Sequence, residues 1–357
     1  MAGVAVIGVG LIGGSIGLAA RERGLGPVTG WVRDQSRADR CVQSGAVDRV
    51  APTLEEAVEG AELVFCCVSV GAIAEVAARA LEASGEETVV TDVGSTKQEL
   101  VARLGSDPRF IGGHPLAGAE TAGVDSARAD LYDDSRWFLT PTSSTSGMLY
   151  DRLQRFIQAI GARPVAIDAV EHDRAMAAVS HLPHVLANTL VGQGLPGSER
   201  LGAVAPSLRD ATRVAGSNPA IWAEIFATNH EAVTEAIGGA IESLERARDV
   251  IGSADPDRIA SWQREASEWR SALSEIETMA GATHRLTILV PNRPGVLAQI
   301  ALALGEAGVN IADMSLDPAP DMSSGAISIW VAGQDQADRA VECVTGLGHR
   351  VTLDGGA

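Results

Sequence analysis

A glycine-rich turn near the N-terminus restricts the fold of this chain more than any other feature. It reads Gly8-Val9-Gly10-Leu11-Ile12-Gly13, between the apolar run Val4–Ile7 and a helical stretch over residues 14–23. Glycines at this spacing allow a tight strand-to-helix turn and let the backbone approach a pyrophosphate, which binds at the helix N-terminus. A tight turn without a ligand is the alternative. We interpret it as a dinucleotide site with cofactor contacts at Gly8, Gly10, Leu11, Ile12 and Gly13.

Apolar runs and helical stretches continue to alternate as far as residue 167. Strands are expected at Val4–Ile7, Val28–Val32, Leu63–Val68, Thr88–Thr91, Phe110–Gly112, Trp137–Thr140 and Val165–Ile167. Helices are expected over residues 14–23, 36–44, 71–83, 95–103 and 147–160. This alternation is typical of a parallel sheet covered on both faces. Residues 1–167 are therefore predicted to form a doubly wound α/β domain of the Rossmann type.

The end of the second strand bears on the choice between NAD and NADP. Val32 stands where an NAD-specific site usually has an acidic residue for the ribose 2′-hydroxyl. Arg33 would suit a 2′-phosphate, whereas Asp34 would suit the ribose. The residues themselves leave this choice open. Arg33, Asp34 and Ser69 complete the expected cofactor contacts.

Two further domains are predicted after residue 167. Residues 168–280 are almost continuously helical in character, and such a block commonly supplies half of an active-site cleft and a dimer interface. Pro183 is expected to kink its first long helix. Residues 284–357 follow a βαββαβ order, which predicts a ferredoxin-like α+β domain.

The composition indicates which kinds of partner the protein can bind and in which compartment it is expected. A formal net charge of −18 disfavours binding to nucleic acid and to anionic membranes. The sequence has no run of about 18 apolar residues that would predict a membrane span, and no basic segment of a secretory signal at its start. Its four cysteines, two of them at Cys66 and Cys67, follow no disulfide or metal-binding pattern. We expect a cytoplasmic protein whose cations gather at its ligand site.

One histidine lies in a segment rich in glycine, Phe110–Glu120, which reads FIGGHPLAGAE. His114 follows two glycines, which we interpret as letting the backbone approach a ligand, and precedes Pro115. Histidine titrates near neutral pH, so His114 is the candidate base, and a hydrogen-bonded loop residue is the alternative. Ser95 either caps the helix that follows it or bonds a substrate hydroxyl or His114. Lys97 is expected to place positive charge near the cofactor.

The helical block contributes two further groups. His181 and His184 are three residues apart and share a helix face if the helix continues through Pro183. A metal ion would need a third ligand, so no metal is predicted, and the two histidines either line a substrate cleft or lie in the core. Arg209 and Arg213 are one turn apart. An arginine in a cleft can hold a carboxylate with two hydrogen bonds, and an exposed helix arginine is the alternative.

Together these motifs resemble the prephenate/arogenate dehydrogenase family of tyrosine biosynthesis. The resemblance covers residues 1–280 and rests on Gly8–Gly13, Asp92–Lys97, Gly113–Gly118, Ser180–His184 and Asp210–Arg213. It implies NAD as cofactor with NADP tolerated, and oxidative decarboxylation of prephenate to 4-hydroxyphenylpyruvate by a homodimer. His114 would accept the proton of the ring hydroxyl, which Ser95 would orient. Substrate contacts would come from Arg213, His184, Ser180 and Glu120. Ala119 departs from the hydroxyl residue that relatives often carry there.

The tail from residue 284 resembles an ACT domain, a small regulatory module of amino-acid biosynthetic enzymes. This resemblance implies an effector site at Asn292, Gly295 and Asn310, with tyrosine as the expected effector. A module that serves only dimerisation is the alternative. Three other functions remain open at this stage: an arogenate dehydrogenase, a 3-hydroxyacid dehydrogenase, and a nucleotide-bound regulatory protein that is not an enzyme. The 3-hydroxyacid reading fits His114 and Ser95 poorly.

Overall fold

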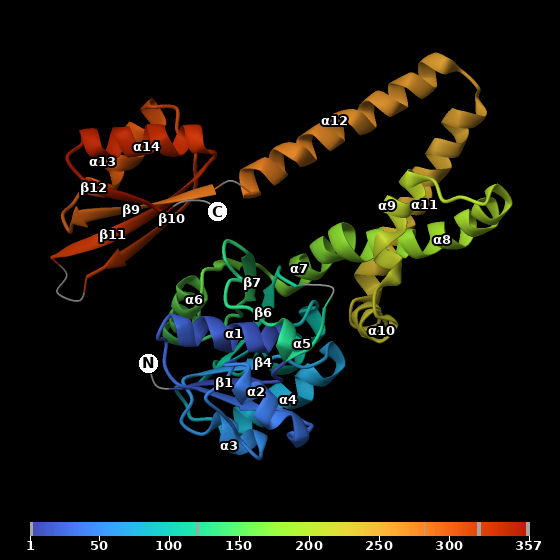
Figure 1. The fold of residues 1–357 in the computed structure, drawn as a ribbon. Coiled ribbons are helices and arrows are strands. Elements are labelled where there is room, and N and C mark those ends of the chain that lie inside the picture. The colour runs from blue at the N-terminus through green and yellow to red at the C-terminus, as the bar shows by residue number, and fades with distance from the viewer. Residues whose placement is uncertain (1–2, 119–120, 282, 320–322, 355–357) are drawn as a thin grey trace. The chain divides into compact units, whose positions relative to one another are not determined.

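The structure is a computed structural model that describes residues 3–118, 121–281, 283–319 and 323–354 (Figure 1). Its internal contacts divide the chain into two compact units, Met1–Ser243 and Leu244–Ala357, and each unit is described by itself. The finer division into three domains stays a prediction.

The first unit contains an eight-stranded sheet in the order β3-β2-β1-β4-β5-β6-β7-β8. Its strands are β1 Val4–Ile7, β2 Val28–Trp31, β3 Arg49–Val50, β4 Leu63–Cys66, β5 Val89–Asp92, β6 Phe110–Pro115, β7 Arg136–Thr140 and β8 Arg163–Ala166. The strands from β3 to β6 pair in parallel, and β7 reverses direction against β6. The predicted Rossmann-type sheet is confirmed. The two-residue edge strand β3 was not predicted, because a strand that short has no periodicity.

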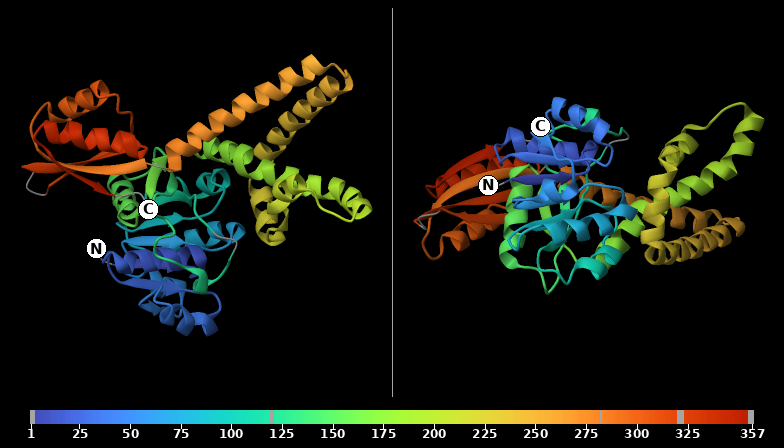
Figure 2. Two further views of the ribbon diagram at one scale, coloured as in Figure 1. Left: turned by 45° about the horizontal axis from the view of Figure 1, so that its top comes forward. Right: turned by 90° about the horizontal axis from the view of Figure 1, so that it is seen from below.

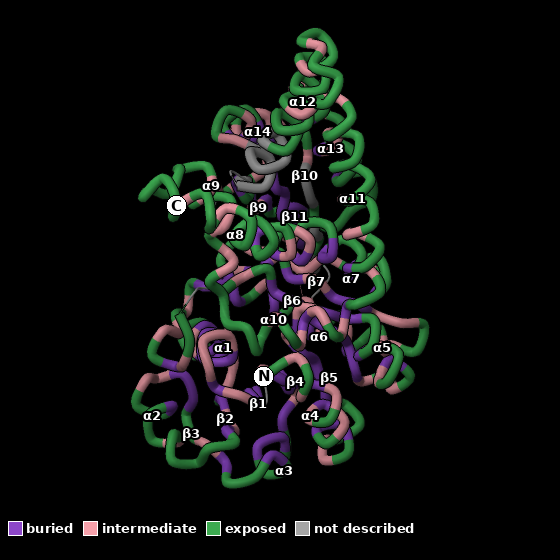
Figure 3. Tube along the Cα trace, turned by 90° about the vertical axis from the view of Figure 1, so that its right-hand side faces the viewer, coloured by how far each residue is buried: buried purple, intermediate pink, exposed green. Residues whose placement is uncertain are grey.

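Helices cover both faces of this sheet. One hydrophobic core joins the sheet to α1 Leu11–Glu22, α2 Ala38–Gln43 and α6 Gly147–Ala159. A second core, on the other face, joins it to α3 Leu54–Val58, α4 Val70–Ala83 and α5 Gln98–Leu104. Successive residues of β4 alternate between them, with Leu63 and Phe65 in the first core and Val64 and Cys66 in the second. All four residues of β1, β4 and β5 are buried, as the purple tube shows in Figure 3.

The sheet leads into a series of helices. They are α7 Ala169–Met176, α8 Leu182–Leu201, α9 Pro206–Thr212, α10 Pro219–Thr228, α11 His230–Gly252 and α12 Pro256–Gly281. A π-helical turn, Ala177–His181, joins α7 to α8 just before Pro183, and the predicted kink there stays a prediction. Pro183 lies in the first turn of α8, where a missing N–H is tolerated, and the wide turn before it accommodates its ring.

The second unit contains the smaller sheet. Its elements are β9 Thr283–Pro291, α13 Val296–Glu306, β10 Ile311–Pro318, β11 Ser324–Ala332, α14 Gln334–Gly346 and β12 Arg350–Asp354. The four strands are antiparallel in the order β10-β11-β9-β12, and α13 and α14 pack on one face of the sheet (Figures 1 and 2). The predicted ferredoxin-like arrangement is confirmed. Among the described residues of the whole chain, no helix is long and apolar enough to cross a membrane.

Candidate active site

The glycine turn lies at the carboxyl end of β1, beside the end of β4. Gly8 has φ +101°, and a Cβ there would lie 2.4 Å from the Cys67 carbonyl oxygen. A Cβ at Gly13 would lie 2.2 Å from the Gly8 carbonyl oxygen. These two glycines therefore allow the strands and α1 to pack closely, as the turn requires.

Gly10 differs from both, because a Cβ at this position would meet no described atom within 4 Å. It is also the N-cap of α1, which has no side-chain cap hydrogen bond and no acidic residue in its first turn. The first N–H groups of α1, starting at Leu11 and Ile12, thus meet an open, uncapped side. These residues fit the pyrophosphate of a dinucleotide, because a helix N-terminus carries partial positive charge.

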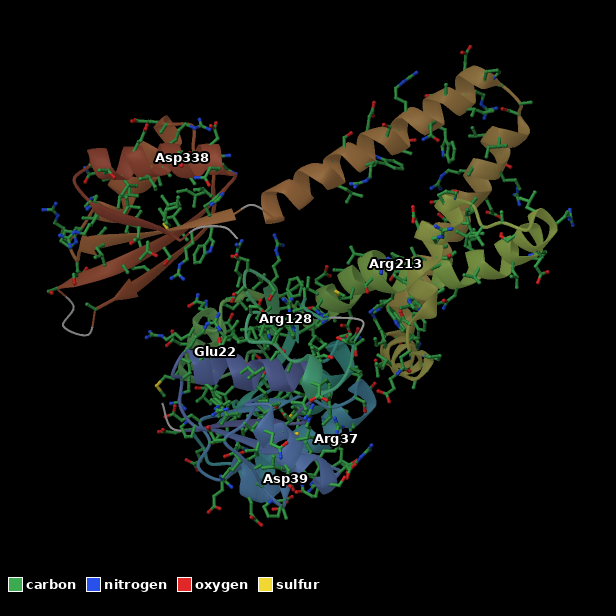
Figure 4. The ribbon with its side chains drawn as sticks, in the orientation of Figure 1. Glu22, Arg37, Asp39, Arg128, Arg213 and Asp338 are labelled. Atoms are coloured by element: carbon green, nitrogen blue, oxygen red, sulfur yellow. The ribbon has the colours of Figure 1, made fainter. Side chains whose placement is uncertain are left out.

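The segment after β2 carries the expected ribose contacts. Val32 is buried, whereas Arg33 and Asp34 are exposed. Asp34 Oδ1 accepts hydrogen bonds from Ser36 N at 3.1 Å and Ser36 Oγ at 2.7 Å, and these bonds lower the pKa of Asp34. The carboxylate therefore caps the short 3-10 helix Gln35–Arg37, whose last residue is labelled in Figure 4.

Ser69 is the N-cap of α4 and is exposed just beyond β4. Since β4 is the neighbour of β1, Ser69 and the glycine turn lie at the same edge of the sheet. Strand order reverses between these two strands, which is where doubly wound folds bind nucleotides.

A buried ion pair between Lys97 and Asp92 lies at the ends of β5 and α5. Both side chains have no exposed surface. Lys97 Nζ also donates to the Gly113 carbonyl oxygen at 2.7 Å, and Gly113 N donates to Asp92 Oδ1 at 2.9 Å. Burial lowers the pKa of Lys97, and the charge of Asp92 opposes this shift. The Lys97 ammonium thus holds β6 against β5, and the expected contribution of its charge near the cofactor stays a prediction.

The two glycines before His114 have a packing role as well. A Cβ at Gly113 would lie 2.5 Å from the Asp92 carbonyl oxygen, and one at Gly112 would lie 2.4 Å from Thr140 Oγ1. The backbone at Asp92 and the Thr140 side chain therefore fill the space next to these glycines. The two glycines let β6 pack closely against its neighbours just before His114.

His114 lies near the end of β6, paired in register with Phe138 of β7, and its side chain is buried. Its Nδ1 is 2.9 Å from Nε2 of His172, and Nδ1 of His172 is 2.8 Å from Asp173 Oδ1. Burial lowers the pKa of His114 well below its ordinary value, assisted by His172, Lys97 and His181. At neutral pH the imidazole is therefore uncharged and able to accept a proton.

Asp173 also joins α7 to α5. Its Oδ1 accepts from Lys97 N and its Oδ2 from Gln98 N, both at 2.8 Å. Lys97 is the N-cap residue of α5, so the alternative role of Ser95 as that cap is wrong. Ser95 is half-buried in the connection between β5 and α5, and its contact with a substrate hydroxyl or with His114 stays a prediction.

His181 and His184 do share a face, because both rings contact Trp222 and Phe226 of α10. The His184 ring stacks on Trp222 with centroids 3.6 Å apart, and burial lowers the pKa of His184. Burial lowers the pKa of His181 to about 4. His181 Nδ1 lies 3.1 Å from Asn229 Nδ2. In the described part of the chain, His181 Nε2 and His184 Nδ1 are buried without a hydrogen-bond partner.

The other predicted substrate contacts are less enclosed. Ser180 is half-buried beside His181. Arg213 begins the 3-10 helix Arg213–Gly216 after α9 and is exposed (Figure 4). Glu120, like Ala119, lies outside the described residues. Within the described chain, no group of three or more histidine, cysteine, aspartate or glutamate side chains is placed to hold a metal ion.

Three buried residues that the motifs did not identify hold this site together: His172, Asp173 and Asn229. The sequence did contain one signal, the adjacent pair His172-Asp173 inside a helical stretch. Titratable side chains are rarely buried without partners, so such a pair indicates a hydrogen-bonded site if the helix is buried. Their partners lie up to 76 residues away in the chain, so helical periodicity alone did not reveal them.

The effector residues lie in the second unit. Asn292 lines a pocket with Val296 and Leu297 of α13 and with Leu316 and Ile327 of the neighbouring strands. Gly295 has φ +87° and is the N-cap of α13. Asn310 is exposed, its N–H donates to Gln336 Oε1 at 2.7 Å, and it does not line this pocket.

Comparison with protein families gives three matches. Residues 16–166 match the family described as prephenate dehydrogenase, nucleotide-binding domain, and residues 168–265 match prephenate dehydrogenase, dimerization domain. Residues 284–342 match the ACT domain. The three matches follow the order of the sheet, the helices and the small second sheet.

Two curated relatives match most of the chain. The prephenate dehydrogenase of Bacillus subtilis is 29% identical over 96% of this chain and 95% of its own length. The cyclohexadienyl dehydrogenase of Zymomonas mobilis is 34% identical over 76% of this chain and 95% of its own length.

Two solved structures share the fold. Prephenate dehydrogenase from A. aeolicus, in complex with hydroxyphenyl propionate and NAD+, has a TM-score of 0.72 and 29% identity, covering 76% of this chain and 98% of that one. Arogenate dehydrogenase from Synechocystis has a TM-score of 0.67 and 25% identity, covering 76% of this chain and 99% of that one.

Proposed function

The chain belongs to the prephenate dehydrogenase family of NAD-dependent oxidoreductases, and we propose that it converts prephenate to 4-hydroxyphenylpyruvate by oxidative decarboxylation. The observation that carries the proposal is the buried, uncharged imidazole of His114, held by His172 and Asp173 at the sheet edge where the glycine turn also lies. An uncharged imidazole beside a dinucleotide site can accept a hydroxyl proton as a hydride departs.

His114 takes the proton of the ring hydroxyl, and the carbon that carries this hydroxyl becomes a carbonyl. NAD+, when bound, supplies the hydride acceptor for that carbon. Loss of carbon dioxide then makes the ring aromatic. Ser95 orients the hydroxyl toward the imidazole. A positioned base of this kind contributes about 10²–10⁴-fold to the rate.

Substrate binding is assigned to His184, Ser180, Glu120 and Arg213. Support comes from the burial of His184 with an unpartnered Nδ1, and from the placement of Ser180 beside His181. Arg213 is proposed to hold a substrate carboxylate with its guanidinium.

Replacing Arg213 with alanine tests this last assignment. We expect KM for prephenate to rise about tenfold or more, the equivalent of about 1.4 kcal/mol, with the affinity for NAD+ unchanged. Arg209→Ala is the matched control, because Arg209 is also exposed and lies one turn earlier in α9. Equal KM values in both variants would place Arg213 outside the substrate site.

Arogenate is the second candidate substrate. It is favoured by the name of one similar protein, the arogenate dehydrogenase of Synechocystis. The decisive experiment is a comparison of initial rates with prephenate and with arogenate, followed as reduced nicotinamide at 340 nm. Turnover of neither compound would contradict the proposed function.

For the cofactor we propose NAD, with NADP tolerated. The A. aeolicus structure contains NAD+. Asp34 accepts two hydrogen bonds from Ser36, and Arg33 is exposed beside it. Asp34 would contact the ribose of NAD, and Arg33 would contact the 2′-phosphate of NADP. The same rate assay with each cofactor decides, and an advantage of tenfold or more for NADP+ would assign the site to Arg33.

We also propose a cytoplasmic homodimer regulated by tyrosine. The dimerization-domain match supports the dimer, and the four free cysteines accord with a reducing compartment. The ACT match and the pocket at Asn292 and Val296 support an effector site. Gly295, as the N-cap of α13, would present helix N–H groups to the carboxylate of an amino acid, and Asn310 would act from the end of the same helix.

A further inference from the structure

The carboxylate of Asp173 determines which nitrogen of His172 carries a hydrogen. It is fully buried and accepts from Lys97 N, Gln98 N and His172 Nδ1. Because a carboxylate only accepts, the hydrogen of His172 lies on Nδ1. The same carboxylate lies at the N-terminus of α5 and near the Lys97 ammonium.

An uncharged His172 with its hydrogen on Nδ1 has a lone pair on Nε2. That atom faces Nδ1 of His114 at 2.9 Å, so His114 Nδ1 must donate. Nε2 of His114 is then left with a lone pair. The titratable groups that face His114 are His172 on α7, Lys97 before α5 and His181 on the π turn; burial disfavours a cation on His114, and the Lys97 ammonium adds to this effect.

The backbone carbonyl of Asp173 has the opposite effect on His181. Asn229 Nδ2 donates one hydrogen to this carbonyl at 2.9 Å, which fixes the orientation of the amide. Its other hydrogen points to His181 Nδ1 at 3.1 Å, so that nitrogen accepts. An uncharged His181 therefore carries its hydrogen on Nε2, which is the buried atom without a protein partner.

We propose that Asp173 holds His114 and His181 in opposite tautomers, the first as a proton acceptor and the second as a hydrogen-bond donor. The carboxylate acts through His172 and the carbonyl acts through Asn229. His172, Asp173 and Asn229 are thus positioning residues that touch the reaction only through the two imidazoles. Resting on the proposed function, this arrangement serves a substrate that loses a hydroxyl proton to His114 and offers an oxygen acceptor to His181.

Nitrogen-15 NMR of the full chain, labelled at histidine, tests the tautomers directly. The chain has seven histidines, and the signals of the two rings are identified by their loss in His114→Asn and His181→Asn. We expect a protonated Nδ1 with a bare Nε2 in His114, and the reverse in His181, at neutral pH. The same tautomer in both rings, or a mixture in either, would overturn the proposal. This measurement needs no turnover, so it stands apart from any failure of the proposed function.

His172→Leu removes the acceptor that faces His114. We expect the tautomer of His114 to become mixed while that of His181 stays unchanged, and kcat to fall by about 10²-fold or more. His172→Gln is the matched control, because its side-chain oxygen can accept from His114 Nδ1 and is expected to restore most of kcat. An unchanged His114 tautomer in His172→Leu would contradict the role of Asp173.

Asn229→Ala tests the effect of Asp173 on His181, as His172→Leu tests its effect on His114. Removing the amide should change the tautomer of His181 and raise KM, with the tautomer of His114 and kcat little altered. A merely structural role would instead change both rings together. A variant in which both tautomers change would therefore also contradict independent control by the two groups of Asp173.

Discussion

The surroundings of His114 and the pocket of the second unit are built in contrasting ways. His114 is enclosed by polar groups from β6, α7 and the connection before α5, with hydrogen bonds that span up to 76 residues of sequence. The pocket beside Asn292 is lined mostly by apolar side chains of β9, α13, β10 and β11. Dry polar networks fix protonation states and geometry, whereas apolar walls mainly provide contact area. This contrast accords with the proposed chemistry in the first region and with the proposed effector binding in the second.

Removing one imidazole from each unit tests this contrast most strongly. His114→Asn is expected to lower kcat by about 10²–10⁴-fold, because the proton acceptor is lost, while NAD+ affinity is retained. His349→Asn removes an imidazole from the second unit and should leave kcat unchanged. Initial rates at 340 nm and NAD+ titration by calorimetry provide the measurements. A near-normal kcat in His114→Asn would remove this residue from the mechanism.

Lys97→Met tests whether the polar network depends on its buried ion pair. The change leaves the Asp92 carboxylate buried without its cation, and we expect the free energy of unfolding to fall by about 3–5 kcal/mol. Arg103→Met is the matched control on α5, since its pair with Glu99 is exposed and such pairs contribute less than about 1 kcal/mol. Urea denaturation of both variants gives the comparison. If both variants lost a similar free energy of unfolding, the buried Lys97–Asp92 pair would contribute no more to stability than the exposed pair.

The pocket of the second unit is tested by filling it. Leu297→Arg places a charged side chain in the apolar lining, and we expect the tyrosine concentration for half-inhibition to rise about tenfold or more, which is about 1.4 kcal/mol. Leu302 lies on the same helix, is 68% exposed and does not line the pocket. The Leu302→Arg variant should therefore show the tyrosine response of the wild type. Activity titrations with tyrosine decide the matter. An identical tyrosine response in both variants would exclude this pocket as the sensor.

The smallest expected effect concerns pH. Because burial lowers the pKa of His114, the imidazole stays uncharged as pH falls through the ordinary histidine value of about 6.5. We therefore expect kcat/KM to change less than about twofold between pH 7.5 and 6.5, and to fall only at lower pH. A decline centred near pH 6.5 would show that His114 titrates like an exposed histidine.

The pH dependence of the rate must be separated from a loss of folded protein at low pH. The pKa values of His114, His181 and His184 are all lowered in the folded chain. Below about pH 6.5 the unfolded chain binds more protons at these groups than the folded chain does, so stability falls as pH falls. Thermal denaturation at each pH separates this loss from protonation of the base.

The sequence by itself determined the architecture and identified His114 as the candidate base. The glycine turn, the alternation of strands and helices, and the βαββαβ tail are local patterns, and the sheets of both units confirm them. The spacing of His181 and His184 also predicted a shared helix face, and both rings contact Trp222. Local geometry sets such features, because the period of a helix or strand is a property of a short stretch.

Only the tertiary structure decided the partners of each polar group. The sequence did not reveal that Lys97 pairs with Asp92 in the buried interior. Gly113 was expected to face a ligand, and it instead allows the close approach of Asp92. The tautomers of the histidines depend on Asp173, which the motifs did not single out. Hydrogen bonds act over about 3 Å, so which donor meets which acceptor is settled only when distant segments fold against one another.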